Sequence, residues 1–227
     1  MGRPQRTQFD GLLLHITIRC NNREFYFHQP EDYQTLLDLM QEMVEAHRIC
    51  VYDYTLMSNH SHWLLSQRGA TPLSTSLRWV FGEYARWYNR TYQRRGHFWE
   101  DRYRTTIIEQ DDHALICMRY IARNPVRAMI VSNPSDYPWS GYKHYAGLKI
   151  DPLLKLHPVY LALGRYPKAR EKRYRDFVEN KIQAEQDKRS QRISGAFAFG
   201  SKAFRTHLKR RFLKDESAHS VNQGVTL

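Results

Sequence analysis

His60 and His62 stand two residues apart in a β-prone segment. Alternate side chains of a strand point to the same face, with Cα atoms roughly 6.5 Å apart. Such a pair suits two ligands of one metal ion. An isolated His-x-His is also compatible with two polar residues on a half-buried strand, so this motif alone does not establish a metal site.

Tyr120 and Asn124 are four residues apart in a segment with helical spacing. Residues at this spacing lie one above the other on a helix, so a nucleophile and a ligand can converge there. The alternative for Tyr120 is a tyrosine that faces the core at the end of an amphipathic helix. Pro125 disfavours the α conformation of Asn124, so the helix ends there or Asn124 caps a new turn.

Local patterns predict the elements that position these side chains. The expected strands cover 12–18, 49–56, 60–66 and 104–109, and the expected helices cover 31–47, about 72–92 and a segment from Asp111 or Asp112 through Tyr120. The two central strands form a hairpin through residues 57–59. The order β-α-β-β-α-β-α predicts an α+β fold, an antiparallel sheet with ferredoxin-like, RNA-recognition-like packing of helices.

The composition changes along the chain. Residues 1–147 are expected to form one catalytic domain, in which 125–147 wrap the core without extending the sheet. Residues 165–214 hold 16 Lys and Arg against 5 Asp and Glu, mostly in helix-compatible sequence. We therefore expect a basic helical extension over 148–213 and a disordered tail over 214–227.

The charge balance indicates the kind of partner. Lys and Arg total 35 against 23 Asp and Glu, a net charge of +12, which favours a polyanion such as nucleic acid. No apolar run approaches the roughly 18 residues that span a bilayer, so no membrane partner is expected. The first residues lack an apolar signal core, which predicts a cytoplasmic location. Three scattered cysteines suggest neither a disulfide framework nor a cysteine zinc site.

Four sequence blocks, taken in order, resemble a known family. Residues 57–65 (MSNHSHWLL) look like the metal-binding strand of single-tyrosine HUH transposases, and 120–128 (YIARNPVRA) look like the nucleophile helix of their REP-associated branch. Residues 98–104 (FWEDRYR) and 137–142 (YPWSGY) resemble the segments before and after that helix, and Asn21-Asn22 also fits. The resemblance covers roughly residues 10–147. The chain departs from the family at Ser61, where a bulky hydrophobic residue is usual; this side chain should face away from the metal.

The resemblance implies a chemistry. A divalent cation, Mg²⁺ or Mn²⁺, is expected on His60, His62 and Asn124, where it polarises a phosphate. Tyr120 is then the nucleophile, which forms a 5′-phosphotyrosine link and leaves a free 3′-hydroxyl. The implied substrate is single-stranded DNA whose palindromic repeats fold as hairpins, and the implied protein is a monomer.

Basic and aromatic residues near the nucleophile are the expected DNA contacts. Arginine pairs bidentately with phosphates, and aromatic rings stack on unpaired bases. The candidates are Arg94, Arg95, Trp99, Arg102, Tyr103, Arg104, Arg123 and Arg127. Two other tryptophans, Trp79 and Trp87, are expected to pack inward.

Two alternatives remain open from the sequence. A non-catalytic nucleic-acid-binding module with an RNA-recognition-like sheet explains the charge but leaves both histidines and Tyr120 unexplained. A metal-dependent phosphoesterase that uses water as nucleophile differs from the first hypothesis in having no covalent adduct.

Overall fold

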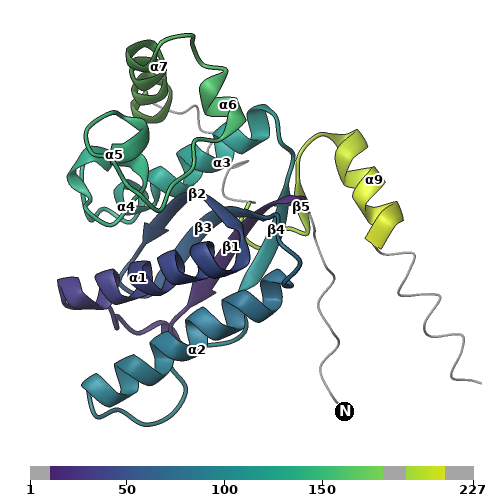
Figure 1. Cartoon of the computed structure of the whole chain (residues 1–227). Helices are drawn as coiled ribbons and strands as arrows, with labels where there is room; N and C mark the ends of the chain where they lie inside the picture. The colour runs from purple at the N-terminus through teal and green to yellow at the C-terminus, as the bar shows by residue number, and fades with distance from the viewer. Residues whose placement is uncertain (1–10, 181–192, 213–227) are drawn as a thin grey trace, which may run out of the picture.

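The computed structural model describes residues 11–180 and 193–212. The elements of the first part are β1 (Leu13–Arg19), the short 3₁₀ turn η1 (Asn21–Arg23), α1 (Pro30–His47), β2 (Ile49–Leu56), β3 (His60–Gln67), α2 (Leu73–Thr91), β4 (Arg104–Ile108) and α3 (Asp112–Ala122) (Figure 1). The four strands and three α-helices lie within two residues of the bounds expected from the sequence, because their apolar patterns are strong.

The strands pair in the order β2-β3-β1-β4, and each of these pairs is antiparallel. This order, with the connections β1-α1-β2 and β3-α2-β4, is the ferredoxin-like arrangement, so the predicted fold class is confirmed. One correction concerns the edge of the sheet. A fifth strand, β5 (Ala198–Phe199), pairs parallel to β4, so the sheet is mixed and the basic extension is not purely helical.

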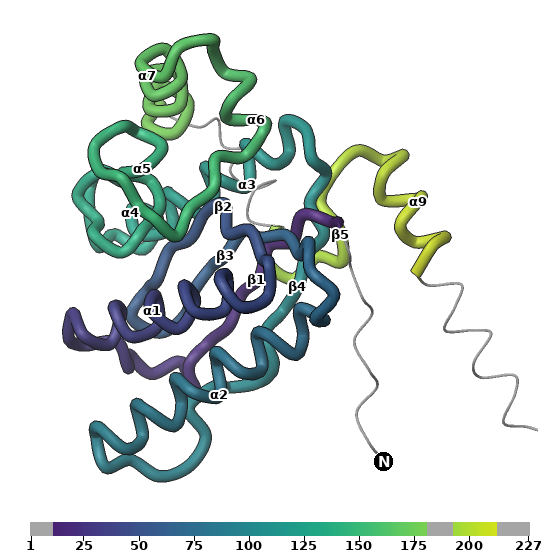
Figure 2. The backbone as a smooth tube through the Cα atoms, viewed as in Figure 1, coloured from purple at the N-terminus to yellow at the C-terminus, as the bar shows by residue number. Residues whose placement is uncertain are grey.

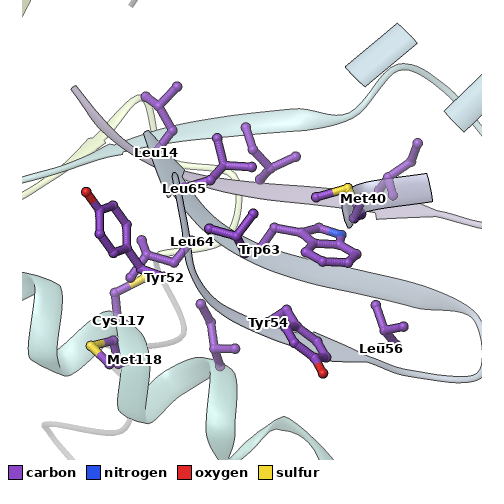
Figure 3. Close-up of a cluster of buried hydrophobic side chains, with 14 of the residues drawn as sticks. Leu14, Met40, Tyr52, Tyr54, Leu56, Trp63, Leu64, Leu65, Cys117 and Met118 are labelled. Carbon is purple, nitrogen blue, oxygen red and sulfur yellow. The ribbon is translucent and has the colours of Figure 1, made fainter. Parts of the chain in front are cut away.

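Helices cover both faces of the sheet. Helices α1 and α2 lie against each other on one face, and α3 crosses the other (Figures 1 and 2). Strand alternation sends Trp63 and Leu65 toward α1 and α2, and His60, His62 and Leu64 toward α3. Figure 3 shows the two layers of the core, with Met40 of α1 on one side of the sheet and Cys117 and Met118 of α3 on the other.

The start of α1 is fixed by its own capping residues and by a contact with the end of α2. Pro30 occupies the first turn, and Gln29 and Asp32 form a capping box. Asp32 is fully buried and accepts hydrogen bonds from the backbone N–H groups of His28 and Gln29, both at 2.8 Å. It also accepts one from the hydroxyl of Tyr92 at 2.7 Å, which ties the end of α2 to the start of α1.

The later helices lie in two places. Elements α4 (Asn124–Arg127), η2 (Pro134–Asp136), α5 (Tyr142–Tyr145), α6 (Pro158–Leu161) and α7 (Pro167–Glu179) pack beyond α3, and α9 (Lys202–Phe212) follows β5 at the edge of the sheet. Four buried tyrosines hold α5, α6 and α7 together: Tyr142, Tyr145, Tyr160 and Tyr174. The predicted tail at 214–227 lies outside the described residues, and the division at residue 147 stays a prediction. Among the described residues, none of the helices has the length and apolar character needed to traverse a bilayer.

Ser61 faces away from the histidines, as expected, and has a specific role. Its hydroxyl is fully buried and accepts a hydrogen bond from the indole N–H of Trp63 at 2.8 Å. Trp63 is itself fully buried on the α1 side of the sheet. The serine therefore satisfies a buried donor that a hydrophobic residue at position 61 would leave without a partner.

We expect Ser61→Ala to lower the free energy of unfolding by about 1–3 kcal/mol, the cost of a buried donor left unpaired. Chemical denaturation measures this loss. The control is the same substitution in a Trp63→Phe background, where no indole N–H remains and the cost should largely vanish. An equal cost in both backgrounds would contradict the role given to this hydrogen bond.

His157 makes the stability of the α6 region depend on pH. Its Nδ1 accepts the backbone N–H of Val159 at 3.1 Å, and its ring, 1% exposed, packs edge-on against Tyr52. Burial lowers the pKa of His157 from 6.5 to about 4. The unfolded chain therefore binds a proton first, so the stability that this ring contributes is present above pH 6.5 and lost as pH falls from 6.5 toward 4.

His157→Asn should flatten that dependence, because asparagine offers a comparable capping acceptor but does not titrate. The expected change is up to about 1.4 kcal/mol per pH unit in the slope of the unfolding free energy between pH 6.5 and 4. Urea denaturation at several pH values in this range measures both slopes. If the variant and the wild type lose stability equally with acid, another group is responsible.

Candidate active site

The face of the sheet beneath α3 carries a cluster of polar side chains. Residues that pair across neighbouring strands share a face, and the register pairs Thr17 with His62, Arg19 with His60, and Thr17 with Arg104. The two histidines predicted from their spacing therefore lie beside β1 and within reach of β4. Arg19, which sequence reasoning did not select, is the cross-strand partner of His60.

His60 is held in a form that can bind a cation. Its Nδ1 lies 2.6 Å from the side-chain oxygen of Asn59. An amide oxygen only accepts, so Nδ1 carries the proton and Nε2 keeps its lone pair. Burial, and then the charge of Arg19, lower the pKa of His60 to about 4, so the ring is neutral near pH 7.

His62 is supported by a third histidine. Its ring lies 5.0 Å from that of His60 between centroids, and its Nδ1 is 2.9 Å from Nε2 of His15, on which it stacks at an interplanar angle of 8°. The hydroxyl of Thr17 is 3.3 Å from the same Nδ1. When His62 Nδ1 donates to His15, Nε2 of His62 is free to bind a cation. Burial lowers the pKa of both rings, that of His15 to about 3.

Sequence reasoning missed His15, although a signal existed. The residue interrupts an otherwise apolar run in β1 and has the same two-residue spacing from Thr17 that joins His60 to His62. It is 1% exposed, and its Nδ1 has no hydrogen-bond partner among the described residues. A polar ring this deeply buried indicates a role beyond packing.

Tyr120 comes from the last turn of α3 and lies over the histidines. Its ring centroid is 5.5 Å from that of His62 and 5.8 Å from that of His15, edge-on to both. Burial raises the pKa of Tyr120, while the charge of Arg127 and a hydrogen bond from Ser194 act in the opposite direction. The guanidinium carbon of Arg127 is 5.1 Å from the tyrosine ring centroid. The predicted nucleophile and the two predicted metal ligands, His60 and His62, thus lie close together in one chain.

Asn124 lies one turn beyond Tyr120, where α3 has ended and α4 begins. The break expected at Pro125 is present, with Pro125 in the first turn of α4. The side-chain nitrogen of Asn124 donates to the carbonyl of Tyr120 at 2.8 Å. Its Oδ1 is the atom that a cation would take, and its role as a ligand stays a prediction.

The predicted arginines lie in different surroundings. Arg102 and Arg104 are exposed and line a cavity of about 400 Å³ together with Thr17, Arg19, Glu100, Asp101 and Ser194. Two others serve the structure. Arg94 donates to the hydroxyl of Tyr26 at 2.6 Å and stacks on its ring, and Arg123 donates to the carbonyl of Val178 in α7 at 2.8 Å. Arg95 is exposed and does not line this cavity.

The aromatic candidates lie on the other side of the loop that leads into β4. Trp99 and Tyr103 line a second cavity, between this loop and α2. Trp87 is half-buried against the core, as expected. Trp79 is 36% exposed, so its predicted inward packing is wrong; the buried stripe of α2 passes through its neighbour Val80.

A second group of ligand-type side chains lies at the opposite end of α3. The ligand atoms of Glu109, Asp111 and His113 fall within 4.8 Å of one another. Asp111 caps α3 by accepting the backbone N–H of His113 at 2.8 Å, and Glu109 accepts hydrogen bonds from the backbone and hydroxyl of Ser201. These bonds account for both carboxylates as structural groups.

The donor set beneath α3 fits a divalent cation by its chemistry. His60 and His62 are neutral imidazoles whose Nδ1 atoms are hydrogen-bonded, which leaves Nε2 as the donor atom, and Asn124 is predicted to add an amide oxygen. Nitrogen ligands favour Mn²⁺ over Mg²⁺, whereas the oxygen suits either ion. We therefore regard this set, and not the group at Glu109, as the candidate metal centre.

The chain is similar to known proteins in sequence and in fold. The family model for IS200-like transposases matches residues 8–124, just over half of the chain. The structure of a REP-associated tyrosine transposase bound to a REP hairpin superposes with a TM-score of 0.55 at 18% identity, covering 70% of this chain and 93% of that one. A putative transposase from Deinococcus radiodurans R1 has a TM-score of 0.37 at 15% identity, covering 57% and 91%.

A comparison with curated proteins yields no match. The likeness to the hairpin-bound structure shows a shared fold, and the family match extends from β1 through Tyr120 to Asn124. The resemblance drawn from the sequence blocks is confirmed: this chain belongs to the family of IS200-like transposases.

Proposed function

We propose that this transposase cuts and rejoins single-stranded DNA with Tyr120 as nucleophile and a divalent cation on His60, His62 and Asn124. The observation that carries the proposal is the position of Tyr120, whose ring lies 5.5 Å from that of His62 on the polar face of the sheet. A buried tyrosine over two neutral imidazoles is an arrangement suited to covalent catalysis next to a metal.

The proposed reaction balances without an added co-reactant. The phenolic oxygen of Tyr120 attacks a phosphodiester phosphorus, the bond from phosphorus to the 3′-oxygen breaks, and the tyrosine becomes linked to the 5′-phosphate. The phenol proton leaves and the departing 3′-oxygen gains one, so the free 3′-hydroxyl can later reverse the reaction at another end. A bound Mg²⁺ or Mn²⁺ would polarise the phosphate.

Two arginines assist the tyrosine. Burial raises the pKa of Tyr120, so the phenol needs positive charge nearby to lose its proton. The charges of Arg127 and Arg19 both act in that direction, Arg127 more strongly. The same guanidinium groups are suited to binding the phosphate that the tyrosine attacks.

A hairpin-forming single strand is the proposed substrate. The chain carries a net charge of +12. A solved structure with a similar fold is that of a REP-associated tyrosine transposase bound to a REP hairpin. The non-catalytic alternative is less well supported, because α3 covers the sheet face that an RNA-recognition module would use for its ligand. Because one chain supplies His60, His62 and Tyr120 together, a monomer suffices for the reaction, and we propose that it acts in the cytoplasm.

Tyr120→Phe should abolish a covalent protein–DNA adduct and retain DNA binding, because it removes one oxygen and keeps the ring. The measurement is a denaturing gel of protein with Mn²⁺ and single-stranded DNA that carries the palindromes flanking its own gene. A label at the 3′ end should migrate with the wild-type protein, and a label at the 5′ end should be released on a fragment with a free 3′-hydroxyl.

The remaining outcomes of this experiment separate the alternatives. Cleavage that survives in Tyr120→Phe would identify water as the nucleophile. Binding without cleavage by the wild type in either metal would favour the non-catalytic module.

His15→Leu should weaken Mn²⁺ binding by about 10- to 100-fold, because Nδ1 of His62 loses the acceptor that orients its ring. His15→Gln is the matched control, since its side-chain oxygen can take the position of the imidazole Nε2. Electron paramagnetic resonance of free Mn²⁺, titrated without DNA, gives the affinity of each variant. Equal affinity of wild type and His15→Leu would show that this histidine serves packing alone.

A further inference from the structure

An aromatic groove lies beside the candidate active site and takes no part in the proposed reaction. It has a volume of about 750 Å³ and runs between one stripe of α2 and residues 96–103, the loop that leads into β4. Its wall and floor include Arg78, Phe81, Gly82, Phe98, Trp99 and Tyr103. This volume is in the range of pockets that enclose a small aromatic ligand.

The wall of the groove is fixed to the rest of the fold. The indole N–H of Trp99 donates to the carbonyl of Phe81 at 2.7 Å, which joins the loop to α2. The backbone N–H of Glu100 donates to the carbonyl of Arg19 at 3.0 Å, and Trp99 forms a β-bridge with Cys20. The groove therefore exists before a ligand arrives, and little ordering is needed to fill it.

Residues 100–102 separate the groove from the arginine cavity, the smaller space lined by Arg19, Arg102 and Arg104. Glu100, Asp101 and Arg102 line both spaces. The smaller cavity adds Arg19 and Arg104, which share a sheet face with the two histidines. The three guanidinium groups and the aromatic wall therefore lie on the two sides of one short stretch of the loop.

The arginine cavity and the aromatic groove together match the chemistry of a nucleotide. A phosphate is attracted by the three arginines, which outnumber the two carboxylates of the same cavity. A base is attracted by aromatic side chains, and stacking tolerates any base because each has a π-face. The carboxylate of Glu100, which is exposed between the two spaces, repels a phosphate and can accept an N–H of a base edge.

We propose that the groove between α2 and residues 96–103 binds an unpaired nucleobase of the DNA strand whose phosphate lies in the arginine cavity. The proposal rests on the proposed function, since it assumes that a single strand reaches the polar face. It assigns to the groove the task of holding that strand in register, so that one phosphodiester is presented to Tyr120.

Gly82 allows the groove to be filled without disturbing the fold. It lies in α2 on the groove stripe, and a Cβ there would meet one atom within 4 Å, the guanidinium nitrogen of Arg86 at 3.8 Å. Gly82→Leu therefore projects a side chain into the groove, while Gly82→Ala adds a methyl group and leaves most of the space open. Both changes favour the helix, so neither should unfold the chain.

The test measures DNA affinity in a Tyr120→Phe background without added metal, by anisotropy of a dye on the hairpin loop. The DNA is a hairpin with a single-stranded flank, and an abasic site is placed at each flank position in turn. At one position the abasic site should weaken binding by about 5- to 100-fold. Gly82→Leu should bind intact DNA as weakly as that abasic DNA and show no further loss on it, whereas Gly82→Ala should behave as the parent.

Two results would overturn the proposal. One is that Gly82→Leu binds intact DNA with the parent affinity. The other is that Gly82→Leu lowers the affinity, relative to the parent, by the same factor for intact and for abasic DNA. Because binding is measured without cleavage, these results are independent of the covalent adduct. An adduct with wild-type protein and an insensitive groove would leave the proposed function standing and remove the base site alone.

Discussion

The antiparallel register of β1 against β3 decides which side chains can meet Tyr120. It sets Thr17 opposite His62 and Arg19 opposite His60, so that two polar residues of β1 flank the histidine pair. A shift of one residue would turn both β1 residues toward α1 and α2 and bring Ile16 and Ile18 beneath the nucleophile. The apolar residues that alternate with the polar ones prevent this slip, because Ile16 pairs with Trp63 in the fully buried layer on the other face. Packing on one face of the sheet thus holds the chemistry on the other.

Burial then sets the electrostatics of the polar face. The imidazoles of His15, His60 and His62 have lowered pKa values, so near neutral pH they offer lone pairs in place of positive charge. Permanent positive charge comes from arginines at the border, Arg19 beside His60 and Arg127 beside Tyr120. Neutral nitrogen ligands surrounded by guanidinium groups are suited to a metal and an anionic strand at the same time.

The chain after residue 192 closes the edge of this site. The hydroxyl of Thr106 lies 2.7 Å from the carbonyl oxygen of Ile193 and 2.7 Å from that of Ala196, so its hydrogen bond is shared between them. Strand β5 extends the sheet beyond β4. Ser194 thereby reaches Tyr120 and Thr17. The basic extension is therefore part of the architecture of the site, although it lies after the residues that the family model matches.

The sequence by itself determined the order of elements through β4 and α3, the ferredoxin-like sheet order, and the histidine and tyrosine candidates. Periodicity is a local property, and the spacing of His60 and His62 places them on one face of any strand. Only the tertiary structure decided which distant residues join them. His15, Arg19 and Ser194 are brought in by strand pairing between segments far apart in the chain, which local patterns do not encode. The same reason explains why Arg94 and Arg123, which are close to the motifs in sequence, contact Tyr26 and α7 in the fold. Strand β5 was not predicted because two residues are too few for a periodic signal.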